Sequence, residues 1–321
     1  MSAVAAPLPP LLLVVTGPTG SGKSDLALEL SDYLAAFLPV EIVSVDSVQV
    51  YRGMDIGSAK PGATARARVA HHLIDIRDPA ESYSAGEFVR DARAAIAAIL
   101  QRGHLPLLVG GTMLYLRALH QGLAVMPPAS EALRREIDAR AASAGWPALH
   151  AELERVDAAA AARIARTDAQ RIQRALEVHR LTGVPISHWQ RSTRGAREEF
   201  RWLRFALLPT SRVDWRRQLA ARFSAMLEVG LVDEVRALYA RGDLTERHSS
   251  VRAVGYRQLW QFCAGECSLE HAVQRANIAT AQLAKRQQTW LRREQGMTPL
   301  PAHTVGLAAI VARSIQAAAR A

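Results

Sequence analysis

Residues 17–24 constrain the fold of this chain more than any other part of its sequence. They are Gly17, Pro18, Thr19, Gly20, Ser21, Gly22, Lys23 and Ser24, which fit the pattern G-x4-G-K-[ST]. An apolar run at residues 11–16 precedes the pattern, and the residues after it have the spacing of an amphipathic helix. A strand, a glycine-rich turn and a helix in this order form a phosphate-binding loop, because backbone N–H groups there face an anion. A glycine-rich turn without a ligand is the alternative, and the complete pattern in this context favours the phosphate site.

Two further apolar runs extend this unit into an α/β fold. Residues 41–45 and 105–109 are typical of short buried strands, and residues 88–100 between them have helical periodicity. Strands that alternate with helices predict a parallel sheet covered by helices on both faces, as in P-loop NTPase-like proteins.

The texture of the sequence changes after Gly122 and changes again near residue 200. Residues 123–200 are rich in Ala, Arg and Glu with helical periodicity, and they predict an all-helical insertion domain. We therefore expect residues 1–122 to form the first part of the P-loop core. Residues 201–300 are expected to return to it, with a strand at 201–208 and long basic helices at 213–239 and 269–293. Residues 301–321 are expected to form a C-terminal helix or tail.

The net charge of +10 is concentrated in the last third of the chain. Residues 201–321 contain 18 Lys and Arg against 9 Asp and Glu, which indicates a polyanionic partner for this part. Biased composition is an alternative source of the charge, because 37 of the 40 basic residues are Arg. That bias explains the preference for Arg over Lys, but it does not explain the uneven distribution.

The sequence argues against membrane, secretory and zinc-dependent classes. No segment approaches the roughly 18 uninterrupted apolar residues of a membrane helix. Residues 1–10 lack the basic start of a signal peptide, so we expect a cytoplasmic protein. Cys263 and Cys267 are the only cysteines, too few for a closed zinc site even with His271 nearby.

Three side chains near the loop have the chemistry that a diphosphate requires. Lys23 is expected to contact phosphate oxygens, and the Ser24 hydroxyl is expected to hold Mg²⁺ together with the phosphates. Asp46 follows the second strand, at the sheet edge where ligands of doubly wound folds bind. The third strand runs into Gly-Gly-Thr rather than an acidic residue, which disfavours a hydrolytic NTPase.

Residues 46–61 narrow the function further. They read D-S-V-Q-V-Y-R-G-M-D-I-G-S-A-K-P and, with the phosphate loop, resemble the signature of bacterial tRNA dimethylallyltransferases. Similar elements continue at residues 71–75, 83–88, 109–115, 168–177, 254–258 and 285–292, so the resemblance covers residues 11 to about 300. Many family members have Ala-Ser-Gly-Lys-Thr where this chain has Gly-Ser-Gly-Lys-Ser, and either final hydroxyl is able to hold magnesium.

The resemblance implies a reaction and roles for individual residues. A dimethylallyl group moves from its pyrophosphate to N6 of the adenosine directly 3′ of the anticodon, in tRNAs that read codons beginning with U. Asp46 is implied as the general base, and Arg222 as a second cation for the leaving group. Thr112 is implied as a third catalytic residue, which contacts the pyrophosphate or the attacking amine in the active-site channel. Asp46 has an alternative role as the cap of a following helix.

The family's contacts with the tRNA anticodon stem-loop map onto five stretches of this chain. These candidates are Asp46, Ser47, Val48, Gln49, Arg134, Gln170, Arg171, Ile172, Gln173, Arg174, Arg252, Ala253, Val254, Gly255, Tyr256, Arg257, Lys285, Arg286, Gln287, Gln288, Thr289, Trp290, Leu291 and Arg292. We expect a monomer that binds tRNA, dimethylallyl pyrophosphate and Mg²⁺. A P-loop small-molecule kinase and a non-catalytic RNA-binding protein are the alternatives. Intact Lys23, Ser24, Asp46 and Thr112 argue against the second.

Overall fold

The computed structural model describes residues 8–124, 126–191 and 199–320. The expectation about a signal peptide concerns residues 1–10, of which 1–7 lie outside this range. The chain forms two compact units. The larger consists of Met1–Ala118 and Glu198–Ala321, and the smaller of Leu119–Arg197.

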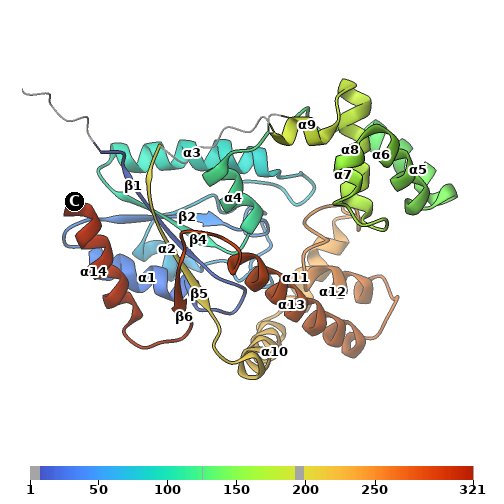
Figure 1. Ribbon diagram of the computed structural model, residues 1–321. Helices are drawn as coiled ribbons and strands as arrows, with labels where there is room; N and C mark the ends of the chain where they lie inside the picture. The colour runs from blue at the N-terminus through green and yellow to red at the C-terminus, as the bar shows by residue number, and fades with distance from the viewer. Residues whose placement is uncertain (1–7, 125, 192–198, 321) are drawn as a thin grey trace, which may run out of the picture. The chain divides into compact units, whose positions relative to one another are not determined.

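A parallel sheet forms the centre of the larger unit, which confirms the predicted α/β fold. Its strands are β1 (Leu11–Thr16), β2 (Val40–Val45), β3 (His71–His72), β4 (Leu105–Gly110), β5 (Arg201–Leu208) and β6 (Thr298–Pro301). They lie in the order β3-β2-β4-β1-β5-β6, and all neighbours are parallel (Figure 1). The carboxyl ends of β1, β2 and β4 therefore meet at one edge of the sheet, and the sequence places the phosphate loop, Asp46 and Thr112 there.

The helices that accompany this sheet are α1 (Lys23–Leu34), α2 (Ala63–Arg68), α3 (Ala85–Gln101), α4 (Met113–Gln121), α10 (Arg212–Glu228), α11 (Leu231–Ala240), α12 (Tyr256–Cys263), α13 (Leu269–Leu291) and α14 (Leu307–Arg320). Of these, α1 and α14 cover one face of the sheet and α3 covers the other, while α10 to α13 pack against one another. The single helix expected over residues 213–239 is wrong. Gly230, with φ of 103°, separates α10 from α11, and this left-handed conformation favours glycine.

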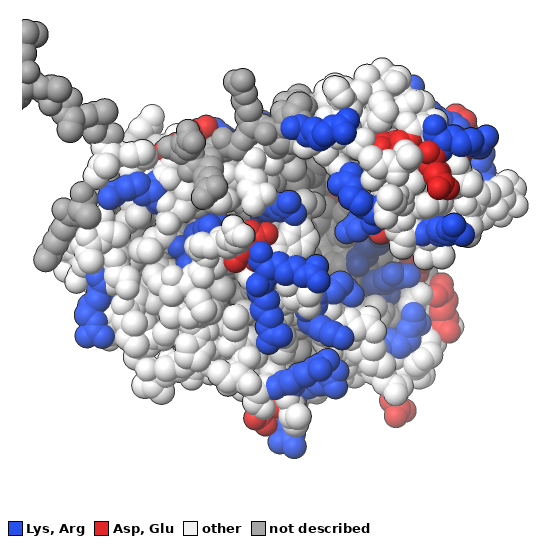
Figure 2. All heavy atoms as spheres, viewed as in Figure 1, with Lys and Arg blue, Asp and Glu red and all other residues white. Residues whose placement is uncertain are grey.

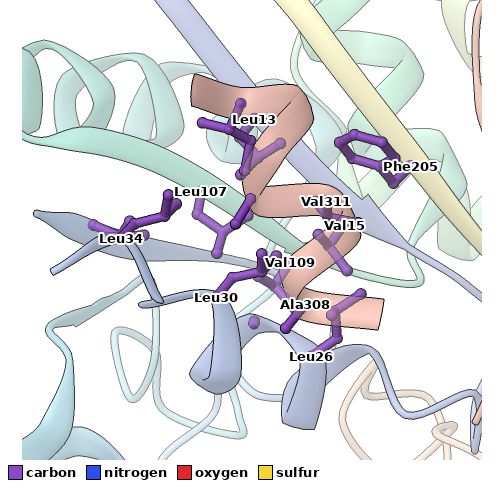
Figure 3. Packing of buried hydrophobic residues seen from close by; sticks show 14 of the residues in the cluster. Leu13, Val15, Leu26, Leu30, Leu34, Leu107, Val109, Phe205, Ala308 and Val311 are labelled. Carbon is purple, nitrogen blue, oxygen red and sulfur yellow. The ribbon is translucent and has the colours of Figure 1, made fainter. Parts of the chain in front are cut away.

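The main core lies between the sheet and the helices α1 and α14. Leu13 and Val15 of β1 point into it, and successive strand residues point to opposite faces, so Leu12 and Val14 face the side that α3 covers. Leu26 and Leu30 of α1 meet Val311 of α14 there (Figure 3). The last helix is thus part of the core rather than an exposed tail.

The smaller unit contains helices joined by loops, and no strand, among its described residues. It contains α5 (Glu131–Ala144), α6 (Trp146–Val156), α7 (Ala158–Ala161), α8 (Ala169–Thr182) and α9 (Ile186–Arg191). Ile137, Leu153, Ile172 and Leu176 pack together in a core of its own. Across both units, no helix in the described part of the chain is long and apolar enough to cross a membrane.

Candidate functional site

The phosphate loop connects β1 to α1 as the sequence predicted. Gly20 and Gly22 have φ values of 73° and 79°, a conformation that costs a side chain energy and that glycine adopts freely. Gly22 is the N-cap of α1, and no side chain caps it there. The first N–H groups of α1 are therefore directed at the space in front of the loop, where the helix dipole favours an anion.

Side chains from the last third of the chain brace this loop. Gln287 of α13 accepts a hydrogen bond from the Thr19 N–H at 3.0 Å and donates one to the Gly111 carbonyl at 2.8 Å. Trp215 of α10 donates its indole N–H to the Thr19 carbonyl at 3.2 Å. A His303 ring nitrogen lies 3.1 Å from the Gly20 carbonyl. Elements more than 190 residues away in sequence thus fix the position of the loop.

A cavity of about 660 Å³ opens in front of the loop, and the larger unit supplies its whole lining among the described residues. Its floor includes Lys23 and Ser24 from the loop and Gly111 from the end of β4. Asp46 lines it from the end of β2, and Arg222 lines it from α10. The structure therefore brings these predicted residues together at one site.

Two cations at this site have no carboxylate partner within salt-bridge distance among the described residues. Burial lowers the pKa of Lys23 to about 8, because desolvation outweighs the attraction of Asp46. Burial also lowers the pKa of Arg222, against the same attraction. Arg222 donates a hydrogen bond to the Thr19 hydroxyl at 3.2 Å, which directs its guanidinium to the loop. An anionic ligand would relieve the cost of burying these two charges together.

The turn after β2 holds the Asp46 carboxylate in place. Its Oδ1 accepts hydrogen bonds from the N–H groups of Val48 at 2.8 Å and Gln49 at 3.3 Å. No helix follows within this stretch, so the alternative that Asp46 caps a helix is wrong, and it caps a turn instead. Its Oδ2 has no hydrogen-bond donor among the described residues, which leaves one oxygen open to a ligand.

Thr112 contacts the turn that carries Asp46. Its hydroxyl accepts a hydrogen bond from the Ser47 N–H at 3.1 Å, and its own N–H donates to the Val45 carbonyl at 3.2 Å. Thr112 therefore joins the end of β4 to the end of β2, beside the cavity. Gly111, and not Thr112, is among the residues that line the cavity, so the local task of Thr112 is to fix the turn behind the carboxylate.

The candidate tRNA contacts divide by exposure. The side chains of Ser47, Gln170, Arg171, Arg252, Arg257, Lys285, Arg286, Thr289 and Arg292 are exposed. Figure 2 shows basic side chains gathering over the region that α10 and α13 occupy in Figure 1. In contrast, Ile172, Tyr256 and Leu291 are buried, with at most 4% of their surface exposed. These three side chains pack in the protein interior, so we correct their assignment from RNA contact to support of the fold.

Two arginines among the candidate tRNA contacts form ion pairs within the helical unit. Arg134 and Arg174 both donate to the Glu177 carboxylate, at 2.9 and 2.6 Å, and that carboxylate is completely buried. Burial alone would raise the pKa of Glu177, but the two guanidinium groups hold it below its usual range. Gln173 donates to Asp138 at 2.6 Å. These side chains stabilise the unit, whatever else they contact.

Sequence reasoning missed Trp215, His303 and Glu234, and it placed Gln287 among RNA contacts rather than at the phosphate loop. Trp215, His303 and Glu234 lie in none of the sequence motifs named above, and Gln287 lies in one that indicates RNA contact rather than contact with the loop. Their contacts with the loop and with residues 55–57 join distant parts of the chain. The basic character of α10 and α13 was the one available signal that these helices serve the site.

Comparison with known proteins places this geometry in context. Residues 49–294 match the family model described as IPP transferase. The tRNA dimethylallyltransferase of Methylococcus capsulatus is 54% identical over 313 residues, which are 98% of this chain and 99% of that one. Among solved structures, the tRNA isopentenylpyrophosphate transferase of Bacillus halodurans is 35% identical with a TM-score of 0.69, covering 96% of each chain. That of Staphylococcus epidermidis is 31% identical with a TM-score of 0.68, covering 97% and 99%.

Proposed function

From the premise that the chain belongs to the IPP transferase family, we propose that it transfers a dimethylallyl group from dimethylallyl pyrophosphate to tRNA. The acceptor is N6 of the adenosine directly 3′ of the anticodon, in tRNAs that read codons beginning with U. The observation that carries the proposal is the pair of half-buried cations without a carboxylate partner, Lys23 and Arg222, at the phosphate loop of a cavity that Asp46 also lines. We propose that it acts on tRNA in the cytoplasm.

The reaction makes two demands, and two parts of the cavity meet them. The bond between the allylic carbon and the pyrophosphate oxygen breaks, and that oxygen gains negative charge. Lys23, Arg222 and the N–H groups at the start of α1 stabilise that charge. Residues Gly17 to Ser24 hold the pyrophosphate before and after the step.

The second demand is the proton of the attacking amine. The adenine nitrogen forms a bond to the allylic carbon and loses a proton, which the open Oδ2 of Asp46 accepts. Thr112 keeps the Asp46 turn against the end of β4, so the carboxylate is oriented before the substrate arrives. We propose catalytic roles for Asp46 and Arg222, and a positioning role for Thr112.

Magnesium fits the residues at the loop. No group of three or more His, Cys, Asp and Glu in the described part of the chain is arranged to hold a metal. Mg²⁺ often binds through one or two protein oxygens together with substrate phosphates and water, which suits the exposed Ser24 hydroxyl. When bound, the ion would neutralise part of the pyrophosphate charge.

The acceptor tRNA is recognised outside the cavity. An anticodon-loop base must leave its stack to reach the allylic carbon, which costs a few kcal/mol that contacts elsewhere must offset. The exposed Arg252, Arg257, Lys285, Arg286 and Arg292 are the side chains we propose for those contacts, through phosphates and loop bases. We propose that the protein acts as a monomer.

The test is transfer of radiolabelled dimethylallyl from its pyrophosphate to unmodified tRNA with Mg²⁺ and without ATP, followed by mapping of the labelled nucleotide. Label on the adenosine 3′ of the anticodon supports the proposal. A small-molecule kinase is the alternative, and it would consume ATP on a small acceptor and give no labelled tRNA. The same assay with ATP in place of the prenyl donor separates the two functions.

A further inference from the structure

We propose that Glu234 is a positioning residue that fixes one wall of the cavity to the segment proposed to contact tRNA. This inference rests on the proposed transfer reaction and adds a residue to it. Glu234 lies in the first turn of α11, outside the cavity, and the proposed chemistry does not use it. Its carboxylate has four hydrogen-bond donors, and they come from two separate segments of the chain.

Three of these donors are backbone N–H groups just before the cavity wall. Glu234 Oε2 accepts from Asp55 at 2.8 Å and from Ile56 at 2.7 Å, and Oε1 accepts from Gly57 at 3.2 Å. Gly57 and the two residues after it, Ser58 and Ala59, line the cavity. The carboxylate thus holds the beginning of this wall at the position that α11 dictates.

The fourth donor ties the wall to the other segment. The Tyr256 hydroxyl donates to Glu234 Oε1 at 2.6 Å, and its side chain is almost completely buried. The ring also packs on Gly57, because a Cβ added there would lie 2.6 Å from a ring carbon. Tyr256 lies between the exposed Arg252 and Arg257, which are proposed tRNA contacts.

Two further hydrogen bonds link the same wall to the turn that carries Asp46, the proposed general base. The Gln49 side chain, in the turn that holds Asp46, donates to the carbonyls of Ser58 at 3.3 Å and Ala59 at 3.2 Å. The wall is therefore held on one side by the turn of Asp46 and on the other by Glu234 and Tyr256. When an acceptor base enters the cavity, this arrangement sets its distance from the allylic carbon, and small misplacements of reacting groups are costly.

The experiment compares Glu234→Gln with Asp233→Asn under saturating concentrations of both substrates. The glutamine replaces one carboxylate oxygen with an NH2 group, which then faces N–H or O–H donors. Asp233 is the exposed neighbour, paired only at the surface with Arg236, and serves as the matched control. We expect Glu234→Gln to lower the single-turnover transfer rate by about tenfold or more, since a charged acceptor of several hydrogen bonds is lost.

Two binding measurements separate positioning from general damage. The affinity for tRNA without the donor, and inhibition by inorganic pyrophosphate, are expected to stay within about twofold of wild type in Glu234→Gln, because Lys23, Arg222 and the exposed arginines remain in place. A transfer rate per folded molecule equal to that of Asp233→Asn would overturn the proposal. So would a loss confined to binding.

Tyr256→Phe keeps the test decisive if Glu234→Gln does not fold. It removes one hydrogen bond and leaves the ring on Gly57, and we expect a transfer rate about threefold lower with unchanged pyrophosphate inhibition. An unchanged rate in that variant would overturn the proposal. The wild-type protein in the same assay separates failure of the proposed function from failure of the proposed role of Glu234. If wild type transfers no dimethylallyl group, the proposed function is contradicted, and the role of Glu234 is not what has failed.

Discussion

Two carboxylates in this molecule each have two cations nearby, and the two groups differ in how the charges are arranged. In the helical unit, Glu177 is fully buried and forms ion pairs with Arg134 and Arg174. At the cavity, Asp46 attracts Lys23 and Arg222 without a salt bridge to either, and both cations have a pKa lowered mainly by burial. The first group satisfies its own charges. The second leaves its cations for a ligand.

The surroundings of an arginine, rather than its place in a family motif, decide what it does. Arg134 and Arg222 both match family positions, and the sequence gives them equal standing. Their surroundings separate them, because a guanidinium paired with a buried carboxylate is needed for stability. One that is directed at a phosphate loop without a carboxylate is available for binding and catalysis. Substitutions in the two groups should therefore affect different measurements.

Asp46→Asn should have the largest effect on turnover. The asparagine retains an oxygen for the N–H groups of Val48 and Gln49, so the turn is preserved, but it is not able to accept a proton. We expect single-turnover transfer to fall by about a hundredfold or more, with tRNA affinity and thermal stability unchanged. A variant with nearly normal turnover would remove Asp46 from the mechanism.

Arg222→Gln should follow, with a loss of about a hundredfold in kcat/KM for dimethylallyl pyrophosphate, typical of removing one group that stabilises developing charge. Stability should stay the same or rise slightly, since a half-buried cation without a carboxylate partner is removed. Arg216→Gln, an exposed position of the same helix, is the control and should behave as wild type. A destabilised Arg222→Gln protein would mean that Arg222 supports the fold as Arg134 and Arg174 do, and it would contradict the comparison.

Arg134→Gln should instead lower the stability of the helical unit. Glu177 would remain buried with one guanidinium fewer, at a cost of about 2 kcal/mol in the free energy of unfolding. Denaturant unfolding followed by a probe in this unit measures the loss. Arg171→Gln, at an exposed position in a neighbouring turn, should change it by less than about 0.5 kcal/mol. Equal effects of the two substitutions would contradict the distinction.

The pH dependence of kcat/KM should show a smaller effect, and it tests the charge of Lys23 in the cavity. Because the pKa of Lys23 is about 8 in the free protein, its ammonium is present below that pH and is lost as the pH rises. We expect kcat/KM for dimethylallyl pyrophosphate to be flat near pH 7 and to fall about tenfold by pH 9. Lys23→Arg keeps its charge over this range, so its profile should lack the fall. A similar decline in Lys23→Arg would assign the titration to another group.

The sequence was sufficient for features that local patterns encode. The phosphate loop, β1, β2, β4 and the returning strand β5 were all predicted, because apolar runs and a glycine pattern are signals within a few residues. The strand β6 was missed, since it has two prolines in four residues and is mostly exposed. Its identity as a strand depends on pairing with β5, nearly a hundred residues away.

The same division holds at the site. Lys23, Ser24 and Asp46 were found from motifs and strand ends, and the structure brings them to one cavity. The support from Gln287, Trp215 and His303 was not predictable, because it consists of single hydrogen bonds between elements that only the tertiary fold brings together. The pairing of Arg134 with Glu177 was missed for a related reason, since Arg134 lies on a different helix.

The most direct test of this account is a crystal structure of the protein with Mg²⁺ and an unreactive thio analogue of dimethylallyl pyrophosphate. We predict that the diphosphate lies at the N-terminus of α1 in contact with Lys23 and Arg222, and that the allylic carbon faces the Asp46 carboxylate. Ion pairs between Arg134, Arg174 and Glu177 should be unchanged. A diphosphate bound away from Lys23 and Arg222, or an Asp46 carboxylate that pairs with either cation while the ligand lies elsewhere, would contradict it.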